Sequence, residues 1–219
     1  MAYSLLWASD HDEANETPVA RMPVVPFAPS WSWASVVGPV WHVDRHLDQF
    51  TNRRSGKDEV KPTLEIVSAT AEPMTANVYG PVKAGVVVVR GQVLQVRYDI
   101  LEGTWRPVLP GREDLGVAAE MPKMEPKVIP DVLDEDPRFS VAGRLQTLFS
   151  ESVFLRAATY ILGGSISSER TEVVALLLVK TPDLAVSGEE TYQRRGIVLH
   201  AFDSKKVWEG VPIRTIRIV

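Results

Sequence analysis

The run Val173-Val174-Ala175-Leu176-Leu177-Leu178-Val179 decides the fold class, because it is the longest uninterrupted apolar stretch in the chain. A short, solidly apolar run of this kind is typical of a strand that is buried on both faces. It is far shorter than the roughly 20 residues that a membrane-spanning helix requires. The run therefore predicts a core strand of a globular domain and no membrane insertion.

Strand-like segments flank this run along the chain. Runs of β-branched residues and alternating apolar and polar residues predict further strands at 63–69, 86–89, 92–100, 196–202 and 213–219. Within 92–100, the alternation places Leu94, Val96 and Tyr98 on one face of the strand and Arg97 on the other.

The helical signal is weak by comparison. Leucines at helical spacing mark 137–159 as a helix, although 153–155 fits a strand equally well, and 44–53 fits a short helical turn. We therefore expect one mainly antiparallel all-β domain over residues 1–219. It would form a barrel or a barrel-like sandwich with one or two short helices.

The segment 107–137 is expected to be a long proline-rich loop, because it holds six of the 16 prolines of the chain. Proline lacks the backbone donor that a central strand or a helix needs. A passive surface excursion and a lid over the mouth of a barrel are both compatible with such a loop.

The composition excludes several classes of function. The chain has no cysteine, which rules out disulfides, thiolate metal sites and a cysteine nucleophile. Its 28 acidic and 24 basic side chains give a formal charge of -4, which argues against nucleic acid as a partner. The first ten residues contain no basic side chain and do not fit a signal peptide, so a cytoplasmic location is expected.

Motifs for catalysis are also missing from the sequence. It contains no phosphate-binding glycine loop and no nucleophile elbow. His42 and His46 have the i, i+4 spacing of metal ligands on a helix, but no third ligand is placed beside them, so no metal is expected. The acidic cluster at 131–136 lacks the spacing of a calcium loop.

Tryptophan is concentrated in one segment, Pro29-Ser30-Trp31-Ser32-Trp33-Ala34-Ser35, which is followed by Gly38-Pro39-Val40-Trp41. On a strand, Trp31 and Trp33 would point to the same face. They would then either pack in the core or form the aromatic wall of an apolar pocket.

The same segment carries a resemblance to a known family. Ala28 to Val40 resembles the "APSWSWAS-x-x-GPV" signature of the C-terminal β-rich region of fungal heterokaryon-incompatibility (HET) domain proteins, although Val37 replaces a residue that is usually polar. Further similar segments are Leu5-Leu6-Trp7, Tyr79-Gly80-Pro81-Val82 with Gly85 and Arg90-Gly91, Tyr192 to Ile197, and Thr215 to Val219. The resemblance implies a fungal β-rich module whose tryptophans help to define its fold.

The N-terminal HET domain, which carries cell-death signalling in such proteins, has no counterpart in this sequence. The resemblance therefore implies no signalling function, and we expect a module recruited to a biosynthetic pathway. Its expected partner is an apolar small molecule, and its oligomeric state is left open.

Two hypotheses about function follow. The first is a cofactor-independent cyclase that holds an apolar terpenoid or polyketide for a pericyclic reaction of the intramolecular Diels–Alder type and donates a hydrogen bond to its carbonyl. The alternative is a non-enzymatic HET-derived regulatory or protein-interaction module.

The cyclase hypothesis assigns candidate residues. Tyr98 is the first candidate donor, because it shares a strand face with apolar neighbours, and the alternatives are Arg97, His42 and His200. The candidate apolar walls are Trp31, Trp33, Trp41, Trp105, Leu94 and Val96.

Overall fold

The strand predicted at 173–179 lies inside a nine-stranded sheet. The computed structural model describes residues 5–9, 11–12, 17–18, 28–32, 35, 40–42, 59–77, 81–99, 104–108, 126–130, 152–162, 170–181, 190–199 and 205–219. Its elements, in chain order, are β1 (Trp7–Ser9), β2 (His11–Asp12), β3 (Thr17–Pro18), β4 (Val40–His42), β5 (Glu59–Pro62), β6 (Glu65–Pro73), β7 (Val82–Asp99), β8 (Thr104–Pro107), β9 (Lys127–Pro130), β10 (Ser152–Leu162), β11 (Arg170–Lys180), β12 (Thr191–Leu199), α3 (Lys205–Trp208) and β13 (Ile213–Ile218).

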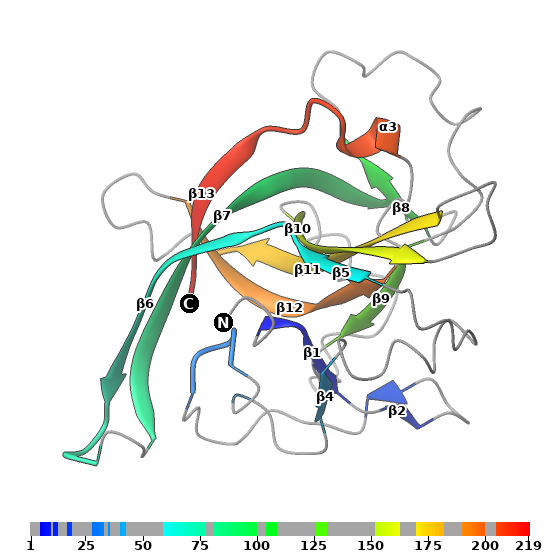
Figure 1. The fold of residues 1–219 in the computed structure, drawn as a ribbon. Helices are drawn as coiled ribbons and strands as arrows, with labels where there is room; N and C mark the ends of the chain where they lie inside the picture. The colour runs from blue at the N-terminus through cyan, green and yellow to red at the C-terminus, as the bar shows by residue number, and fades with distance from the viewer. Residues whose placement is uncertain are drawn as a thin grey trace.

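The large sheet curls back on itself (Figure 1). Its main order is β5-β10-β11-β12-β13-β7-β6, and an additional pairing of β10 with β7 closes a ring of hydrogen-bonded strands, β7-β10-β11-β12-β13. The pairs in this ring are antiparallel except for β12 with β13, which are parallel. The expected all-β, mainly antiparallel and barrel-like fold is confirmed.

The prediction that 173–179 is buried on both faces is also confirmed. Successive side chains of a strand point to opposite faces. On β11, Val174, Leu176 and Leu178 belong to one buried cluster. The alternate residues Val173, Ala175 and Leu177 belong to a second cluster, on the other face of the sheet.

The first cluster, here called the inner cluster, fills the interior of the ring. All five ring strands contribute to it, with residues such as Val89 of β7, Leu155 of β10, Ile197 of β12 and Ile216 of β13. The residues of β13 that alternate with Ile216 face outward, and Ile213 is 63% exposed. The space enclosed by the ring is thus packed with side chains.

The second cluster, here called the outer cluster, lies on the outside of the ring under β8 and α3. Its members are Leu94, Val96, Trp105, Phe154, Val173, Ala175, Leu177, Val198, Val207, Trp208 and Val211. No described residue of β13 belongs to it.

A single 18-residue strand, β7, organises both clusters. It pairs with β6 and β13 along its first half and with β10 and β8 along its second half. Gly91 does not interrupt the strand. A Cβ at this position would lie 3.0 Å from Cδ1 of Leu155 and 3.4 Å from Cβ of Leu64, so the glycine permits close packing against neighbouring side chains.

The structure decides two local alternatives. Residues 153–155 form a strand and not a helix, because they lie in β10, where Val153 and Leu155 join the inner cluster and Phe154 joins the outer cluster. Trp31 lies in a turn, in which the amide of Ser32 donates to the carbonyl of Pro29 at 2.9 Å, so strand alternation does not apply there.

The proline-rich segment is described only in part. It contributes β9, a four-residue strand that pairs with 196–199 of β12 on the edge opposite to β11. Residues 109–125 and 131–137 lie outside the described residues, as do 44–53 and 138–151. Among the described helices, none is long and apolar enough to cross a membrane.

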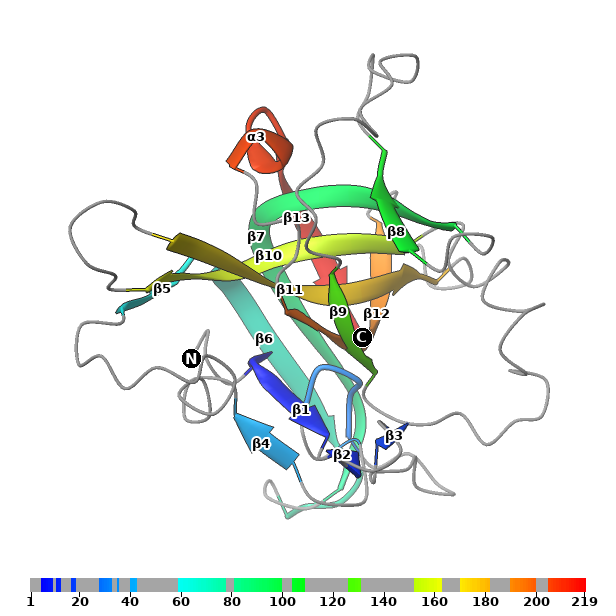
Figure 2. The same cartoon turned by 90° about the vertical axis from the view of Figure 1, so that its right-hand side faces the viewer.

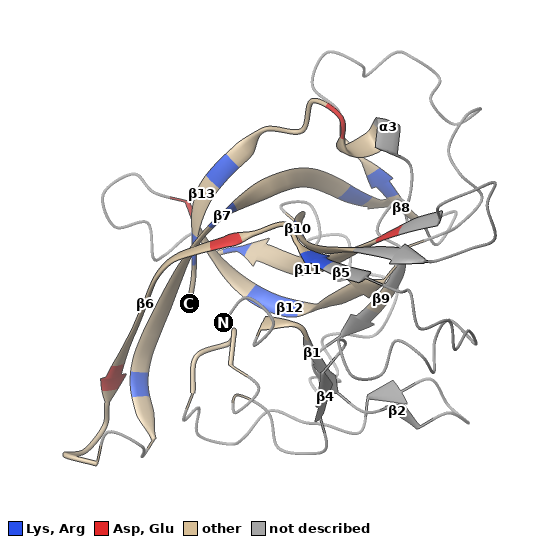
Figure 3. Cartoon of the chain, in the orientation of Figure 1, with Lys and Arg blue, Asp and Glu red and all other residues tan. Residues whose placement is uncertain are grey.

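β6 and the first part of β7 form a hairpin that extends away from the ring (Figures 1 and 2). The residues of β6 are exposed from Val67 to Pro73. Charges of both signs lie on the two strands (Figure 3), and Nζ of Lys83 lies 3.0 Å from Oε1 of Glu72. Both of these side chains are well exposed, so the ion pair contributes little to stability.

Candidate functional site

The structure brings together four of the residues that the sequence proposed for ligand binding. Leu94, Val96 and Trp105 lie in the outer cluster, and Tyr98 packs against it. Alternation along β7 places Leu94, Val96 and Tyr98 on one face, as expected, and the antiparallel register sets Tyr98 opposite Trp105 of β8.

An aromatic row runs across this face. The ring centroids of Tyr98 and Trp105 are 5.2 Å apart and their planes are tilted by 59°. The centroid of Trp105 is 5.3 Å from that of Phe154, again in a tilted arrangement. Tilted pairs at such distances are favourable aromatic contacts. Phe154 is fully buried, whereas Tyr98 is half-buried, so the row runs from the core toward solvent.

Other proposed residues lie elsewhere. Arg97 is exposed, on the face of β7 opposite to Tyr98. Trp31 packs against the inner cluster and is therefore separated from Trp105 by the sheet. Trp41 and His42 lie on β4, but their side chains are outside the described residues, as are Trp33 and His200 altogether.

Sequence reasoning missed a polar group beside the outer cluster. Nη1 of Arg156, on β10, donates to Oε1 of Gln92 on β7 at 2.8 Å, and its Nη2 donates to Oγ1 of Thr159 at 2.8 Å. The guanidinium carbon lies 5.7 Å from the ring centroid of Trp208, a cation–π arrangement. The available signal was a lone charge inside the otherwise apolar run 153–158.

Gln92 connects this group to the end of α3. Its Nε2 donates to the carbonyl of Trp208 at 2.9 Å and to that of Val211 at 3.4 Å. The turn after α3 contains Gly210, whose φ of 79° favours glycine. The side-chain amide of Gln92 therefore fixes the position of Trp208 and orients the guanidinium of Arg156.

Burial lowers the pKa of Arg156 from its ordinary value. Within the described part of the chain, the contacts of this guanidinium are with neutral groups, the Gln92 amide, the Thr159 hydroxyl and the Trp208 ring. Its Nε is shielded from solvent and has no hydrogen-bond acceptor there.

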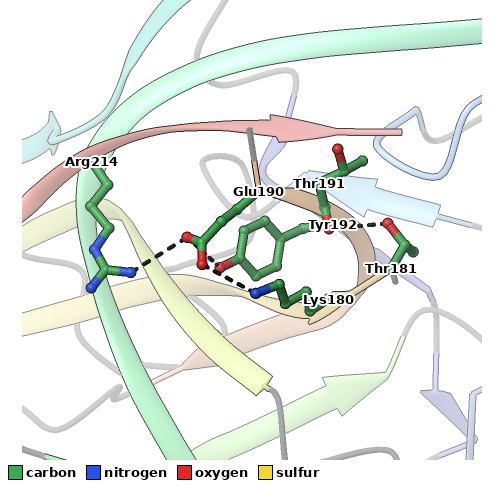
Figure 4. A network of polar contacts seen from close by, with 6 residues as sticks. All are labelled: Lys180, Thr181, Glu190, Thr191, Tyr192 and Arg214. Carbon is green, nitrogen blue, oxygen red and sulfur yellow. Dashed lines mark hydrogen bonds and ion pairs between the residues drawn. The ribbon is translucent and has the colours of Figure 1, made fainter. Parts of the chain in front are cut away.

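A second polar group lies where β11, β12 and β13 meet (Figure 4). The Glu190 carboxylate is 3.3 Å from Nζ of Lys180 and 3.4 Å from Nη1 of Arg214, and it accepts a hydrogen bond from Tyr192 at 3.1 Å. Burial raises the pKa of Glu190, but the hydrogen bonds from Lys180 and Tyr192 and the charges of Lys180 and Arg214 together lower it below its ordinary value. All its partners come from adjoining strands, so this group joins strand ends.

The segment that contains the tryptophan signature also connects distant parts of the fold through hydrogen bonds. The hydroxyl of Ser30 donates to the carbonyl of Val219 and accepts from the backbone amide of Arg194 at 3.2 Å. Nη1 of the buried Arg194 donates to the carbonyl of Leu5 at 3.0 Å. This turn thus attaches the first described residues and the C-terminal residue to β12.

No group of three or more histidine, cysteine or acidic side chains that could hold a metal occurs within the described ranges. A comparison of the chain with protein-family models, with curated proteins and with solved structures finds no match in any of the three. The candidate site is therefore defined by its chemistry alone. It is a buried aromatic and aliphatic cluster, with the half-buried phenol of Tyr98 at one edge and the half-buried guanidinium of Arg156 at another.

Proposed function

We propose that the outer cluster binds an apolar small molecule and that the chain acts on it as a cofactor-independent cyclase of the pericyclic type. The observation that supports this proposal is the position of Tyr98, a half-buried phenol on one face with Leu94 and Val96 and beside Trp105. The ring interior and the buried members of the outer cluster are both packed with side chains, so the proposal places the ligand at the edge of the outer cluster, beside the half-buried ring of Tyr98.

The proposed reaction makes few chemical demands on the protein. An intramolecular Diels–Alder reaction converts the two π bonds of a diene and the one π bond of a dienophile into two carbon–carbon σ bonds and one new π bond, and no electron, proton or atom is added. The aromatic and aliphatic side chains would hold diene and dienophile in contact, which contributes up to roughly 7–11 kcal/mol in favourable cases. The phenol of Tyr98 would donate to a conjugated carbonyl and stabilise the charge that develops on its oxygen.

The substrate class we propose is a polyene aldehyde or acid of terpenoid or polyketide type, in fungal secondary metabolism. This part of the proposal rests on the resemblance of the tryptophan signature to the C-terminal region of HET proteins.

The experiment compares product formation from an uncyclised polyene aldehyde with and without purified protein. Tyr98→Phe removes the donor and should slow cyclisation at least tenfold, because one hydrogen bond to developing charge is lost. Tyr192→Phe is the matched control, since that hydroxyl bonds Glu190 and its ring belongs to the inner cluster. Wild-type protein that leaves the rate and the product ratio at the no-protein values would sink the proposal.

A second candidate function is a protein-interaction module, and the projecting hairpin favours it. A two-stranded ribbon is marginally stable in water unless a face of it is covered, and among the described residues the cover here is at Gly85, where Pro29 packs. β6 is exposed from Val67 to Pro73 and forms an edge of the sheet. Hydrogen exchange tests this alternative. If the amides of 68–73 are already strongly protected in the isolated chain, the hairpin is stable without a partner, and this alternative is contradicted.

A further inference from the structure

The edge of the large sheet at β6 carries backbone groups that no other strand of the described chain pairs with. β6 stands at one end of the strand order, and among the described residues it pairs with β7 alone. Its residues from Val67 to Pro73 are exposed. An open edge of this kind is a template for a further strand, and proteins blunt it with charges, prolines or bulges.

Such blunting devices lie at the two ends of β6 but not between them. The pairing with β7 shifts register between Ile66 and Ser68 and again between Glu72 and Pro73. The stretch between these irregularities, 68–71, has the sequence Ser-Ala-Thr-Ala, with no charge and no proline. The open part of the edge is therefore short, bounded at both ends and lined by small side chains.

The packing at Gly85 shows which backbone groups point to this edge. Gly85 of β7 is the register partner of Ala71. A Cβ added to Gly85 would lie 3.3 Å from the carbonyl oxygen of Thr70, so that carbonyl points toward β7. The peptide groups of successive residues alternate between the two sides of an antiparallel strand. The N–H and C=O groups of Ala69 and Ala71 therefore point away from β7, toward the open edge.

The open stretch is complementary to itself. If two copies pair antiparallel about Thr70, Ala69 lies opposite Ala71 of the second copy, and the outward groups of these residues form hydrogen-bonded pairs. Thr70 then lies opposite Thr70 of the second copy, and such threonine pairs are favourable in sheets. Ser68 lies opposite Glu72 of the second copy, so a hydroxyl donor faces a carboxylate acceptor. No two like charges face each other in this register.

We infer that two copies of this chain associate by pairing their β6 edges, which joins the two sheets into one. The same edge serves in both copies, so the contact closes at the dimer and does not continue into a fibre. The contact is small, and we expect a weak dimer with a Kd between about 1 µM and 1 mM. This inference rests on the second candidate function, the protein-interaction module, and names a second copy as its partner.

Sedimentation equilibrium of the full chain over a range of concentrations tests the pairing. The mass of the wild-type protein should rise from 24.3 kDa toward twice that value. Ala69→Pro removes an outward N–H and no hydrogen bond to β7, so it should abolish the dimer.

A charge exchange at the centre of the contact tests the identity of the partner. Thr70→Lys and Thr70→Glu each set like charges opposite each other and should weaken the dimer about 3- to 10-fold. An equimolar mixture of the two variants should regain the lost affinity, because opposite charges then face each other. Both variants keep every backbone group, so they carry the test if the proline variant does not fold.

Thr215→Glu is the matched control for Thr70→Glu. It makes the same change at an exposed position of β13, which lies on the other side of β7 from β6. This control should dimerise as the wild type does.

The outcomes separate this inference from the candidate function on which it rests. A wild-type chain that stays monomeric up to about 1 mM, a dimer unaffected by all three β6 variants, or a mixture of charge variants no tighter than either alone overturns the self-pairing. The hairpin would then remain open to a different protein. Strong hydrogen-exchange protection of 68–73 at concentrations at which the chain is monomeric would instead contradict the interaction module itself.

Discussion

Gly85 of β7 provides a direct test of how the tryptophan signature docks on the sheet. It is a buried glycine on the hairpin side of β7. A Cβ added there would lie 2.3 Å from Cγ and 3.2 Å from Cβ of Pro29, and 3.3 Å from the carbonyl oxygen of Thr70. The proline ring is stiff and the carbonyl belongs to β6, so neither neighbour can move aside cheaply.

Gly85→Ala should therefore destabilise the fold. Overpacking of this kind costs about 1–3 kcal/mol. Reduced freedom of the unfolded chain offsets about 0.4–1 kcal/mol of that cost. The expected net loss is about 1–2 kcal/mol in the free energy of unfolding, or a fall in Tm of roughly 2–8 °C for a chain of this size.

Urea denaturation followed by far-ultraviolet circular dichroism measures this loss. Pro29→Gly removes the ring that the new methyl group would strike, so a double-mutant cycle should show a coupling of at least about 1 kcal/mol between the two positions. Additive effects of the two substitutions, or an alanine variant as stable as the wild type, would refute the packing of Pro29 on Gly85.

Two further substitutions test the polar groups that join strand ends. The folded pKa of Glu190 lies below its unfolded value of about 4.3, so its contribution is present above that pH and is lost as the pH falls through the folded pKa. The stability difference between wild type and Glu190→Gln should be under about 1 kcal/mol near neutral pH, because the carboxylate is partly exposed, and should shrink in denaturant titrations as the pH is lowered below the unfolded pKa. Ser30→Ala removes the hydroxyl shared by Val219 and Arg194 and should cost about 1–3 kcal/mol by thermal unfolding, whereas Ser30→Thr, which keeps the hydroxyl, should cost less. An alanine variant no less stable than the threonine variant would contradict this role.

Local sequence patterns were sufficient to predict the burial of a residue and the face it occupies where both depend only on the strand that contains it. The unbroken apolar run of β11 predicted burial on both faces, and the alternation of Leu94, Val96 and Tyr98 predicted that they share a face. Both predictions depend only on the period of two along a strand.

Pairing between distant strands could not be predicted in the same way. The contact of Arg156 with Gln92 joins residues 64 positions apart and exists because β10 pairs with β7 in one particular register. No local period encodes that register or the parallel pairing of β12 with β13. Trp31 packs against the inner cluster, which is the core alternative, but from a turn and not a strand, because the serines and prolines around it favour a turn.

Two neighbouring leucines of β11 face opposite sides of the sheet, so their substitution can separate effects on stability from effects on ligand binding. Leu176 and Leu177 have the same side chain, are 0% and 2% exposed, and face the inner and the outer cluster respectively. Replacing either by alanine should cost about 2–5 kcal/mol, because each leaves a cavity in a packed cluster. If ligands bind on the outer face, only Leu177→Ala should also change the affinity for an apolar probe such as 1-dodecanol, as measured by calorimetry on folded protein. An equal change in Leu176→Ala would instead place the ligand inside the ring, and the filled interior would then have to open to admit it.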